Sequence, residues 1–213
     1  EMLVSGTILA LGGYDDPIVF EPLITLESGA STWSGLTISG SGSVLKHIDY
    51  HNAENGLSVS NANNISVEGI MILSESILDF GIHVDNSDNI EITSSDFSNL
   101  KTAVYLNECH SSSISNNTFY GGSSDSLGIY VNNGTSIDIS ANTISSGYEY
   151  GIFIESGSDN SIENNDITSV ISAIYNQSDN STITLNTMDD VFYGIYIGTA
   201  TGNTIQNNNI DNS

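Results

Sequence analysis

Short stretches in which apolar and polar positions alternate recur along the chain. Residues 128–131 read GIYV, residues 151–154 read GIFI and residues 194–197 read GIYI. An apolar period of two predicts β-strands, and the runs of Asn, Ser, Asp and Gly between these stretches predict turns. The repeating stretches hold strand patterns and no helix pattern. The chain is therefore predicted to be all-β.

A small residue followed by an apolar one marks the start of each repeat. Successive markers are separated by 21, 25, 22, 25, 23, 22 and 21 residues. The markers are Gly35-Leu36, Gly56-Leu57, Gly81-Ile82, Ala103-Val104, Gly128-Ile129, Gly151-Ile152, Ala173-Ile174 and Gly194-Ile195. A unit of this length cannot bury its own inward face, whereas stacked units fill one continuous interior. The spacing predicts a parallel β-solenoid.

A second series of residues recurs at the same spacing. Each member is an asparagine that stands two residues before an apolar residue. The series, which we call the Asn ladder, is Asn117, Asn142, Asn165, Asn186 and Asn208. Side-chain amides stacked on consecutive coils can hydrogen-bond to one another. An antiparallel β-sandwich is the alternative, but that fold does not require equivalent residues to recur at such a spacing.

These features together resemble a known superfamily. The coil length, the Gly-Ile strand starts, the Asn ladder and the opening VSGTILALGGYDDPIVFEP followed by WSGLTISG are similar to the right-handed parallel β-helix repeat superfamily, which has the pectate-lyase-like fold. The resemblance implies an all-β, single right-handed parallel β-helix of about eight coils of 21–25 residues. Within that superfamily, the sequence most resembles exported or cell-surface β-helix modules and the copper-maturation periplasmic β-helix proteins.

The same pattern predicts the domain organisation. Residues 1–213 are expected to form one β-helix domain, with an N-terminal cap or incomplete first coil over 1–33 and regular coils over 34–213. Few residues follow the last Asn-ladder strand, and an uncapped solenoid end exposes core and strand edges. The sequence is therefore expected to be a fragment of a longer protein with more coils or another domain, or to meet a second chain at this end.

Charge narrows the range of partners. The chain has 26 acidic residues against two basic ones, Lys46 and Lys101, and its formal charge is −24. It has no basic patch to neutralise phosphates, so nucleic acid and anionic membrane surfaces are excluded as partners. No apolar run reaches the ~18 residues of a membrane span, so membrane insertion is not expected. Neutral glycans, or anionic ones bridged by Ca²⁺, remain as partners.

An outward stripe of side chains suggests where such a partner would bind. If the marker isoleucines point inward, the next position on each strand points outward. Those positions, which we call the aromatic strip, are His83, Tyr105, Tyr130, Phe153, Tyr175 and Tyr196. The next outward positions, the amide column, are Asp85, Asn107, Asn132, Glu155 and Gln177. Sugar rings stack on aromatic faces while amides and carboxylates bind hydroxyls; alternatively, the aromatic residues stabilise the sheet by cross-strand pairing.

The catalytic motifs of the resembled superfamily are mostly missing. Lyase-type elimination uses an arginine, and the chain has none. Of the polygalacturonase-like elements it has Asp-Asp pairs alone, at Asp15-Asp16 and Asp189-Asp190, and both pairs are typical of turns. The alginate-epimerase-like pairing of Asp-Pro with histidine has no histidine near Asp16-Pro17. We therefore expect no enzyme activity, and the alternative is a carbohydrate-active, glycoside-hydrolase-like enzyme with a paired-carboxylate site.

Two groups of residues are candidate metal ligands. His47, Asp49 and His51 alternate and would share one face of a strand, although the two histidines would lie ~13 Å apart unless the strand bends. Asp159 and Asp179 belong to Ser-Asp-Asn turns on adjacent coils, where Ca²⁺ could find oxygen ligands. A metal-handling accessory protein is therefore a third hypothesis. No cofactor is expected to be required, and Ca²⁺ is the candidate ion.

The leading functional hypothesis combines these features. We expect a secreted, non-catalytic module, extracellular or at the cell surface, that acts as a rigid spacer and recognises glycan on the aromatic strip.

Overall fold

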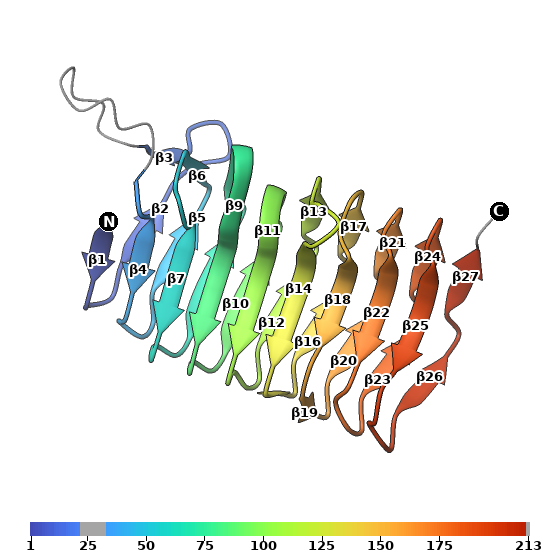
Figure 1. The fold of residues 1–213 in the computed structure, drawn as a ribbon. Coiled ribbons are helices and arrows are strands. Elements are labelled where there is room, and N and C mark those ends of the chain that lie inside the picture. The colour runs from blue at the N-terminus through green and yellow to red at the C-terminus, as the bar shows by residue number, and fades with distance from the viewer. Residues whose placement is uncertain (22–32, 212–213) are drawn as a thin grey trace.

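The computed structural model describes residues 1–21 and 33–211, with the backbone alone described for 73–78. Within these ranges the regular elements are β-strands, and every strand pairs with its neighbours in parallel. Figure 1 shows the strands side by side in chain order, with the two termini at opposite ends of the stack. No described residues form a helix long and apolar enough to span a membrane.

Each coil contributes strands to three stacks. Stack A holds β1 (Met2–Val4), β4 (Leu36–Ile38), β7 (Leu57–Ser60), β9 (Met71–Asp85), β11 (Asp96–Asn107), β14 (Leu127–Asn132), β18 (Tyr150–Ile154), β22 (Ser172–Asn176) and β25 (Tyr193–Ile197). Stack B holds β2 (Leu9–Leu11), β5 (Val44–Lys46), β8 (Ile65–Glu68), β10 (Ile90–Thr93), β12 (Ser113–Ser115), β16 (Asp138–Ser140), β20 (Ser161–Glu163), β23 (Thr182–Thr184) and β26 (Thr204–Gln206). Stack C holds β3 (Ile18–Phe20), β6 (Ile48–His51), the first residues of β9 and β11, β13 (Thr118–Tyr120), β17 (Thr143–Ser145), β21 (Asp166–Thr168), β24 (Thr187–Asp189) and β27 (Asn209–Asp211). The short pair β15 (Gly134–Thr135) and β19 (Gly157–Ser158) lies outside the three stacks.

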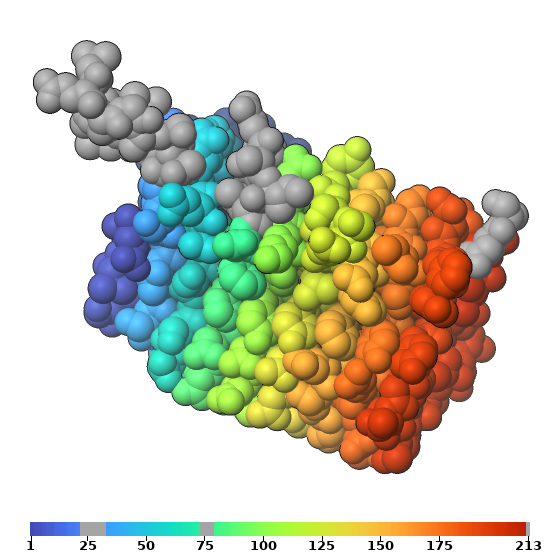
Figure 2. Space-filling model, viewed as in Figure 1, coloured from blue at the N-terminus to red at the C-terminus, as the bar shows by residue number. Residues whose placement is uncertain are grey.

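The inward positions form one continuous core. In stack A, Ile129 pairs with Ile152 and Ile152 with Ile174, and all three side chains are fully buried. The same register links the predicted markers from Leu36 to Ile195. Successive coils appear as successive bands of colour in the space-filling view of Figure 2. The predicted fold class, a parallel β-helix in which each repeat is one coil, is confirmed.

Close contact between coils explains the small residue in each marker. A Cβ atom placed on Gly128 would lie 2.5 Å from the carbonyl oxygen of Gly151 on the next coil. A Cβ on Gly151 would lie 2.9 Å from the carbonyl oxygen of Ala173 and 2.9 Å from the Ile167 side chain. A larger side chain at these positions would push neighbouring coils apart. The markers therefore begin with a small residue because the next coil leaves little room for a side chain at the start of these stack A strands.

The predicted Asn ladder is confirmed at the corner between stacks B and C. Each Nδ2 donates to the Oδ1 of the next asparagine along the stack, with 3.1 Å from Asn117 to Asn142 and 2.9 Å from Asn165 to Asn186. The same Oδ1 atom also accepts the backbone N–H of the preceding ladder residue, and the Nδ2 donates to a backbone carbonyl such as that of Ile139. The four residues from Asn117 to Asn186 are at most 1% exposed. Their buried polar groups are thus paired.

The ladder holds the backbone in a turn that most residues avoid. The residue before each ladder asparagine has a positive φ between 53° and 58°. These residues are Asn116, Ala141, Asn164, Leu185 and Asn207. The left-handed conformation costs a residue with a side chain roughly 1–2 kcal/mol. The ladder hydrogen bonds offset this cost, so the polar corner and the strained turn depend on each other.

The N-terminal residues join the same pattern. β1, β2 and β3 pair with β4, β5 and β6, so residues 1–20 contribute one strand to each stack. The predicted cap or incomplete first coil over residues 1–33 thus includes three strands. Its remaining part, residues 22–32, lies outside the described residues.

Removing one ladder rung should destabilise the chain. Asn165→Ala would leave the N–H and the amide of Asn142, and the carbonyl of Ile139, without their partner. We expect a loss of about 2–4 kcal/mol in the free energy of unfolding, measured by denaturant titration. The matched control is Asp166→Ala, because Asp166 is the next residue and its side chain is exposed. Equal stability of the two variants would contradict the role given to the ladder.

Candidate functional site

The aromatic strip runs along the outward face of stack A. Tyr105 pairs in register with His83 and Tyr130, and Phe153 pairs with Tyr130 and Tyr175. Tyr175 pairs with Tyr196, whose side chain is 46% exposed, while the other members are half-buried. The strands that carry the strip, β9 to β25 of stack A, lie next to one another in Figure 1. The alignment predicted from the sequence is therefore confirmed.

The rings of the strip stack on each other. The ring centroids of His83 and Tyr105 are 4.9 Å apart, those of Tyr105 and Tyr130 are 4.6 Å apart, and the ring planes are within 10° of parallel. Tyr130 and Phe153 continue the stack at 5.2 Å and 17°. Parallel rings at this separation overlap face to face rather than lying side by side. Over these residues the strip presents ring edges and hydroxyl groups, so a sugar meets edges instead of the faces expected from the sequence.

The stack is interrupted at one step. The ring planes of Phe153 and Tyr175 meet at 84° with their centroids 5.1 Å apart. Tyr175 and Tyr196 are again nearly parallel, at 4.6 Å and 17°. The strip therefore consists of two stacks of rings that meet at a right angle.

The amide column is hydrogen-bonded to itself and to the strip. Asn107 Nδ2 donates to Asp85 Oδ1 at 2.6 Å, and Asn132 Nδ2 donates to Asn107 Oδ1 at 2.9 Å. Farther along, the side chains turn toward the rings: the Tyr130 hydroxyl donates to Glu155, and Gln177 Nε2 donates to the Tyr175 hydroxyl at 3.0 Å. These bonds hold the polar side chains in place before any ligand arrives.

Tyr105, Tyr130 and His83 of the strip are uncharged near pH 7. Burial raises the pKa of Tyr130, and the hydrogen bond and negative charge of Glu155 raise it further. Burial also raises the pKa of Tyr105, although a hydrogen bond with Asn132 opposes this effect. Burial lowers the pKa of His83, and the Asp85 charge only partly compensates. The phenols therefore keep their protons and the imidazole is uncharged.

A second set of aromatic residues was not identified from the sequence. Phe80, Tyr150 and Tyr193 each stand directly before the small residue of a marker. The Phe80 and His83 rings are 5.1 Å apart, and the Tyr150 and Phe153 rings are 5.2 Å apart, so these residues widen the strip. The signal that could have found them is the repeated aromatic-Gly-Ile triplet at residues 80–82, 150–152 and 193–195.

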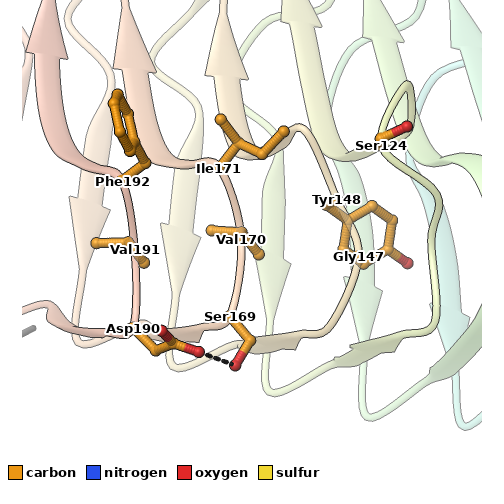
Figure 3. A pocket seen from close by; sticks show the side chains of 9 residues that line it. All are labelled: Ser124, Gly147, Tyr148, Ser169, Val170, Ile171, Asp190, Val191 and Phe192. Carbon is orange, nitrogen blue, oxygen red and sulfur yellow. Dashed lines mark hydrogen bonds between the residues drawn. The ribbon is translucent and has the colours of Figure 1, made fainter.

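A shallow groove crosses the turns that lead from stack C to stack A. Figure 3 shows Val170 beside Val191 on its floor, with Ile171 and Phe192 along one side. On the other side the Ser169 hydroxyl donates to Asp190 at 3.0 Å. The groove has a volume of about 570 Å³, and nothing in the sequence pattern indicated it. It offers apolar contact and no catalytic pair.

The structure brings together two of the candidate metal ligands His47, Asp49 and His51: His47 and Asp49 line one pocket, and His51 is not among its lining residues. His47 lies in the corner before β6 with a φ of 48°, and its ring packs against Gly69 and the ring of Tyr14. Asp49 and His51 are on β6 itself, where His51 is exposed. His47 therefore does not lie on the same strand as Asp49 and His51, contrary to the sequence prediction, because the chain turns at His47 before β6 begins.

The stacking of Asp159 and Asp179 is also corrected. Ser158, not Asp159, lies opposite Asp179, because Asp159 and Asp179 are 20 residues apart whereas the pairing register here, as between β20 and β23, is 21 residues. The Asp159 carboxylate accepts a hydrogen bond from Ser158, and that of Asp179 accepts two from Thr201. Their carboxylates thus bind different partners.

The comparisons with known proteins give the family. The family described as "Periplasmic copper-binding protein (NosD)" matches residues 16–191, most of the chain. The chain belongs to this family. No curated protein matches the sequence.

Solved structures show the same fold at low identity. The Dettilon tailspike protein has a TM-score of 0.62 and 13% identity, over 98% of this chain and 54% of that one. An alginate lyase from Paenibacillus sp. str. FPU-7 has a TM-score of 0.57 and 16% identity, over 97% and 85%. A DFA-IIIase mutant from Arthrobacter chlorophenolicus A6 has a TM-score of 0.55 and 10% identity, over 83% and 58%. The chain thus spans little more than half of two of these proteins.

The described His, Cys, Asp and Glu side chains do not fit a copper site. All four histidines, the cysteine and the three methionines lie among the described residues, and no three His, Cys, Asp or Glu side chains of the described chain come close enough to share an ion. Cys109 is buried, and burial raises the pKa of its thiol to about 11, which keeps it protonated. Asp49 and Asp96 pair with Met71 from the coil before it and the coil after it. Their backbones are therefore two strand spacings, or roughly 9.6 Å, apart. Among the described residues, no group of His, Cys, Asp and Glu side chains is arranged to hold the copper named in the family description.

The burial of His83 predicts a pH dependence of stability. Because its pKa is lowered from the usual 6.5 in the folded state, the unfolded chain binds the proton more readily. The contribution of uncharged His83 to the stability of the fold is complete above pH 6.5, and it is lost as the pH falls toward the lowered pKa of His83. We expect His83→Phe, which keeps an aromatic ring, to lose less thermal stability than the wild type between pH 7.5 and pH 5. The exposed His110→Phe serves as control and should follow the wild type; if His83→Phe does so too, His83 is not the titrating group.

Proposed function

We propose that this chain is an exported, non-catalytic β-helix module that binds a neutral or Ca²⁺-bridged glycan along the aromatic strip. The observation that carries the proposal is the pairing of the strip with the amide column on one face of stack A. Each coil adds one ring edge and one polar side chain at a repeat of about 4.8 Å. That spacing is close to the length of one sugar residue in an extended chain.

Preorganisation supports binding at this face. The rings are held by their neighbours at 4.6–5.2 Å, and Asn107 and Asn132 are held by hydrogen bonds. Ordering side chains at an interface otherwise costs about 0.5–1.5 kcal/mol for each one immobilised. Each Asn amide carries two N–H donors, and the hydrogen bond along the amide column uses one of them. The second donor of Asn107, together with the tyrosine hydroxyls, is available to sugar hydroxyl groups, whereas Asn132 also bonds with Tyr105.

The comparisons agree with this class of ligand. One of the similar structures is a lyase named for alginate and another is a tailspike protein, although identity at this level speaks for the fold alone. The family description places its members in the periplasm, which supports export of this chain to the periplasm or the cell surface. The continuous stack of coils suits a rigid spacer that holds the face in a fixed direction.

A carbohydrate-active enzyme is the second candidate. It is favoured by the hydrogen bond between Tyr130 and Glu155, which places a carboxylate and a phenol together in the middle of the strip. A glycosidase would need a second carboxyl group about 5–9.5 Å from the first. The missing arginine weighs against the lyase chemistry of the superfamily.

A glycan array in the presence of Ca²⁺ and again with chelator tests the binding proposal. We expect saturable binding to at least one neutral or Ca²⁺-dependent glycan, with no reducing or unsaturated ends released. Tyr105→Ala combined with Tyr130→Ala should weaken binding about tenfold, because two ring edges and their hydroxyls are lost. Tyr120→Ala is the matched control, since Tyr120 is 57% exposed but belongs to stack C.

Three outcomes would contradict the proposal. The first is the absence of glycan binding, and the second is a loss of glycan affinity in the Tyr120→Ala control equal to that in the double variant. The third is glycan turnover that disappears in Glu155→Gln. The last of these would favour the enzyme.

A further inference from the structure

A pocket lined by tyrosines lies at one end of the aromatic strip. It has a volume of about 310 Å³, at the lower end of the range for ligand sites. Its walls come from four rings, a carboxylate and a buried hydroxyl: Tyr150, Tyr175, Tyr193, Tyr196, Glu149 and Ser172, with Ile171 beside them. We call it the tyrosine pocket.

A missing ring creates the pocket. Tyr150, Ser172 and Tyr193 occupy equivalent positions on β18, β22 and β25. Ser172 thus leaves a notch between two tyrosines that stand two coils apart, or about 9.6 Å by strand spacing. The gap of two strand spacings between their backbones leaves room for a small group between the two tyrosine side chains. A cation is attracted to an aromatic ring when it lies within about 6 Å of the ring centroid.

The remaining rings complete a corner. The planes of Tyr150 and Tyr175 meet at 88° with centroids 5.4 Å apart, so the pocket has aromatic walls in two directions. Tyr193 and Tyr196 are 52% and 46% exposed, which leaves the pocket open to solvent on their side. Such a cluster of rings around a small volume is the arrangement that binds quaternary ammonium groups.

Charge complementarity favours a cation as the occupant. Glu149 lines the pocket, and its charge adds to the effect of burial in raising the pKa of the Tyr150 hydroxyl. The Ser172 Oγ is buried and forms no hydrogen bond within the described part of the chain, so another oxygen is available at the base. Neither of the two lysines lines the pocket, and the formal charge of the whole chain is −24.

We propose that the tyrosine pocket binds a quaternary ammonium group such as that of choline. The rings would surround the methyl groups, and the Glu149 carboxylate would balance the charge. This site differs in ligand chemistry from the glycan-binding face, so either proposal can fail while the other holds.

Titration of the whole chain with choline chloride at constant ionic strength tests this site. Isothermal calorimetry should give saturable binding at one site per chain. The neutral isostere 3,3-dimethylbutan-1-ol, which has the same shape without the charge, should bind at least about tenfold more weakly. Glucose and ammonium chloride at equal concentrations should neither bind at this site nor displace choline.

Variants of pocket residues separate the roles of ring and charge. Tyr193→Ala should weaken choline binding about fivefold, whereas Tyr193→Phe should stay within about twofold because the ring is kept. Glu149→Gln should weaken it about fivefold as well. Tyr120→Ala, which removes an exposed tyrosine outside the pocket, should bind choline like the wild type.

The competing occupants have distinct signatures, and each would overturn the proposal. Equal binding of the neutral isostere would make the pocket an apolar site, and binding of glucose in place of choline would make it part of the glycan face. If ammonium chloride displaces choline equally well, choline binds only because any cation is attracted to a negatively charged protein. Absence of saturable choline binding, or unchanged affinity in Tyr193→Ala, would also reject it.

Discussion

In-register parallel pairing between coils is the constraint on which the other features depend. It places each side chain about 4.8 Å from its equivalents on the coils before and after, so every position of the repeat becomes a column of similar residues. Inward columns become the isoleucine core, as with Ile129, Ile152 and Ile174. The corner column becomes the Asn ladder, in which each amide satisfies the backbone of the neighbouring coil. Outward columns become stacks of rings.

The same constraint limits where a ligand can bind. A regular column of rings uses its own faces for stacking, as Tyr105 and Tyr130 do at 4.6 Å, and leaves edges for a partner. Accessible faces and cavities arise where the repetition fails. The turn of the ring plane at Tyr175 and the small residue Ser172 are two such failures on the same strand, β22, and the tyrosine pocket lies at both. Function in a repeat fold is thus to be sought at irregular coils.

Repetition also explains how much could be predicted from the sequence. The fold, the inward positions, the Asn ladder and the alignment of the strip follow from spacing, because equivalent residues must stack. Ring orientation depends on side-chain torsion angles, which spacing does not report, so the covered faces of Tyr105 and Tyr130 were not foreseen. The offset between Asp159 and Asp179 arises because their separation of 20 residues is one short of the local register of 21, and the bend at His47 comes from a left-handed turn. The aromatic residues before the markers, Tyr150 and Tyr193, do carry a sequence signal, because each begins an aromatic-Gly-Ile triplet.

Cysteine pairs across neighbouring coils give the most direct test of this register. In a Cys109→Ser background, Ser145→Cys with Thr168→Cys places two cysteines opposite each other on β17 and β21. Their Cα atoms would be about 4.8 Å apart, within the range that a disulfide bridges. Ser145→Cys with Asp166→Cys keeps the same face but shifts the pairing by two residues, to roughly 8 Å, which is beyond that range. In-register stacking predicts that the first pair forms an intrachain disulfide on mild oxidation and the second does not, as measured by mass spectrometry. A disulfide in the second pair and none in the first would contradict it.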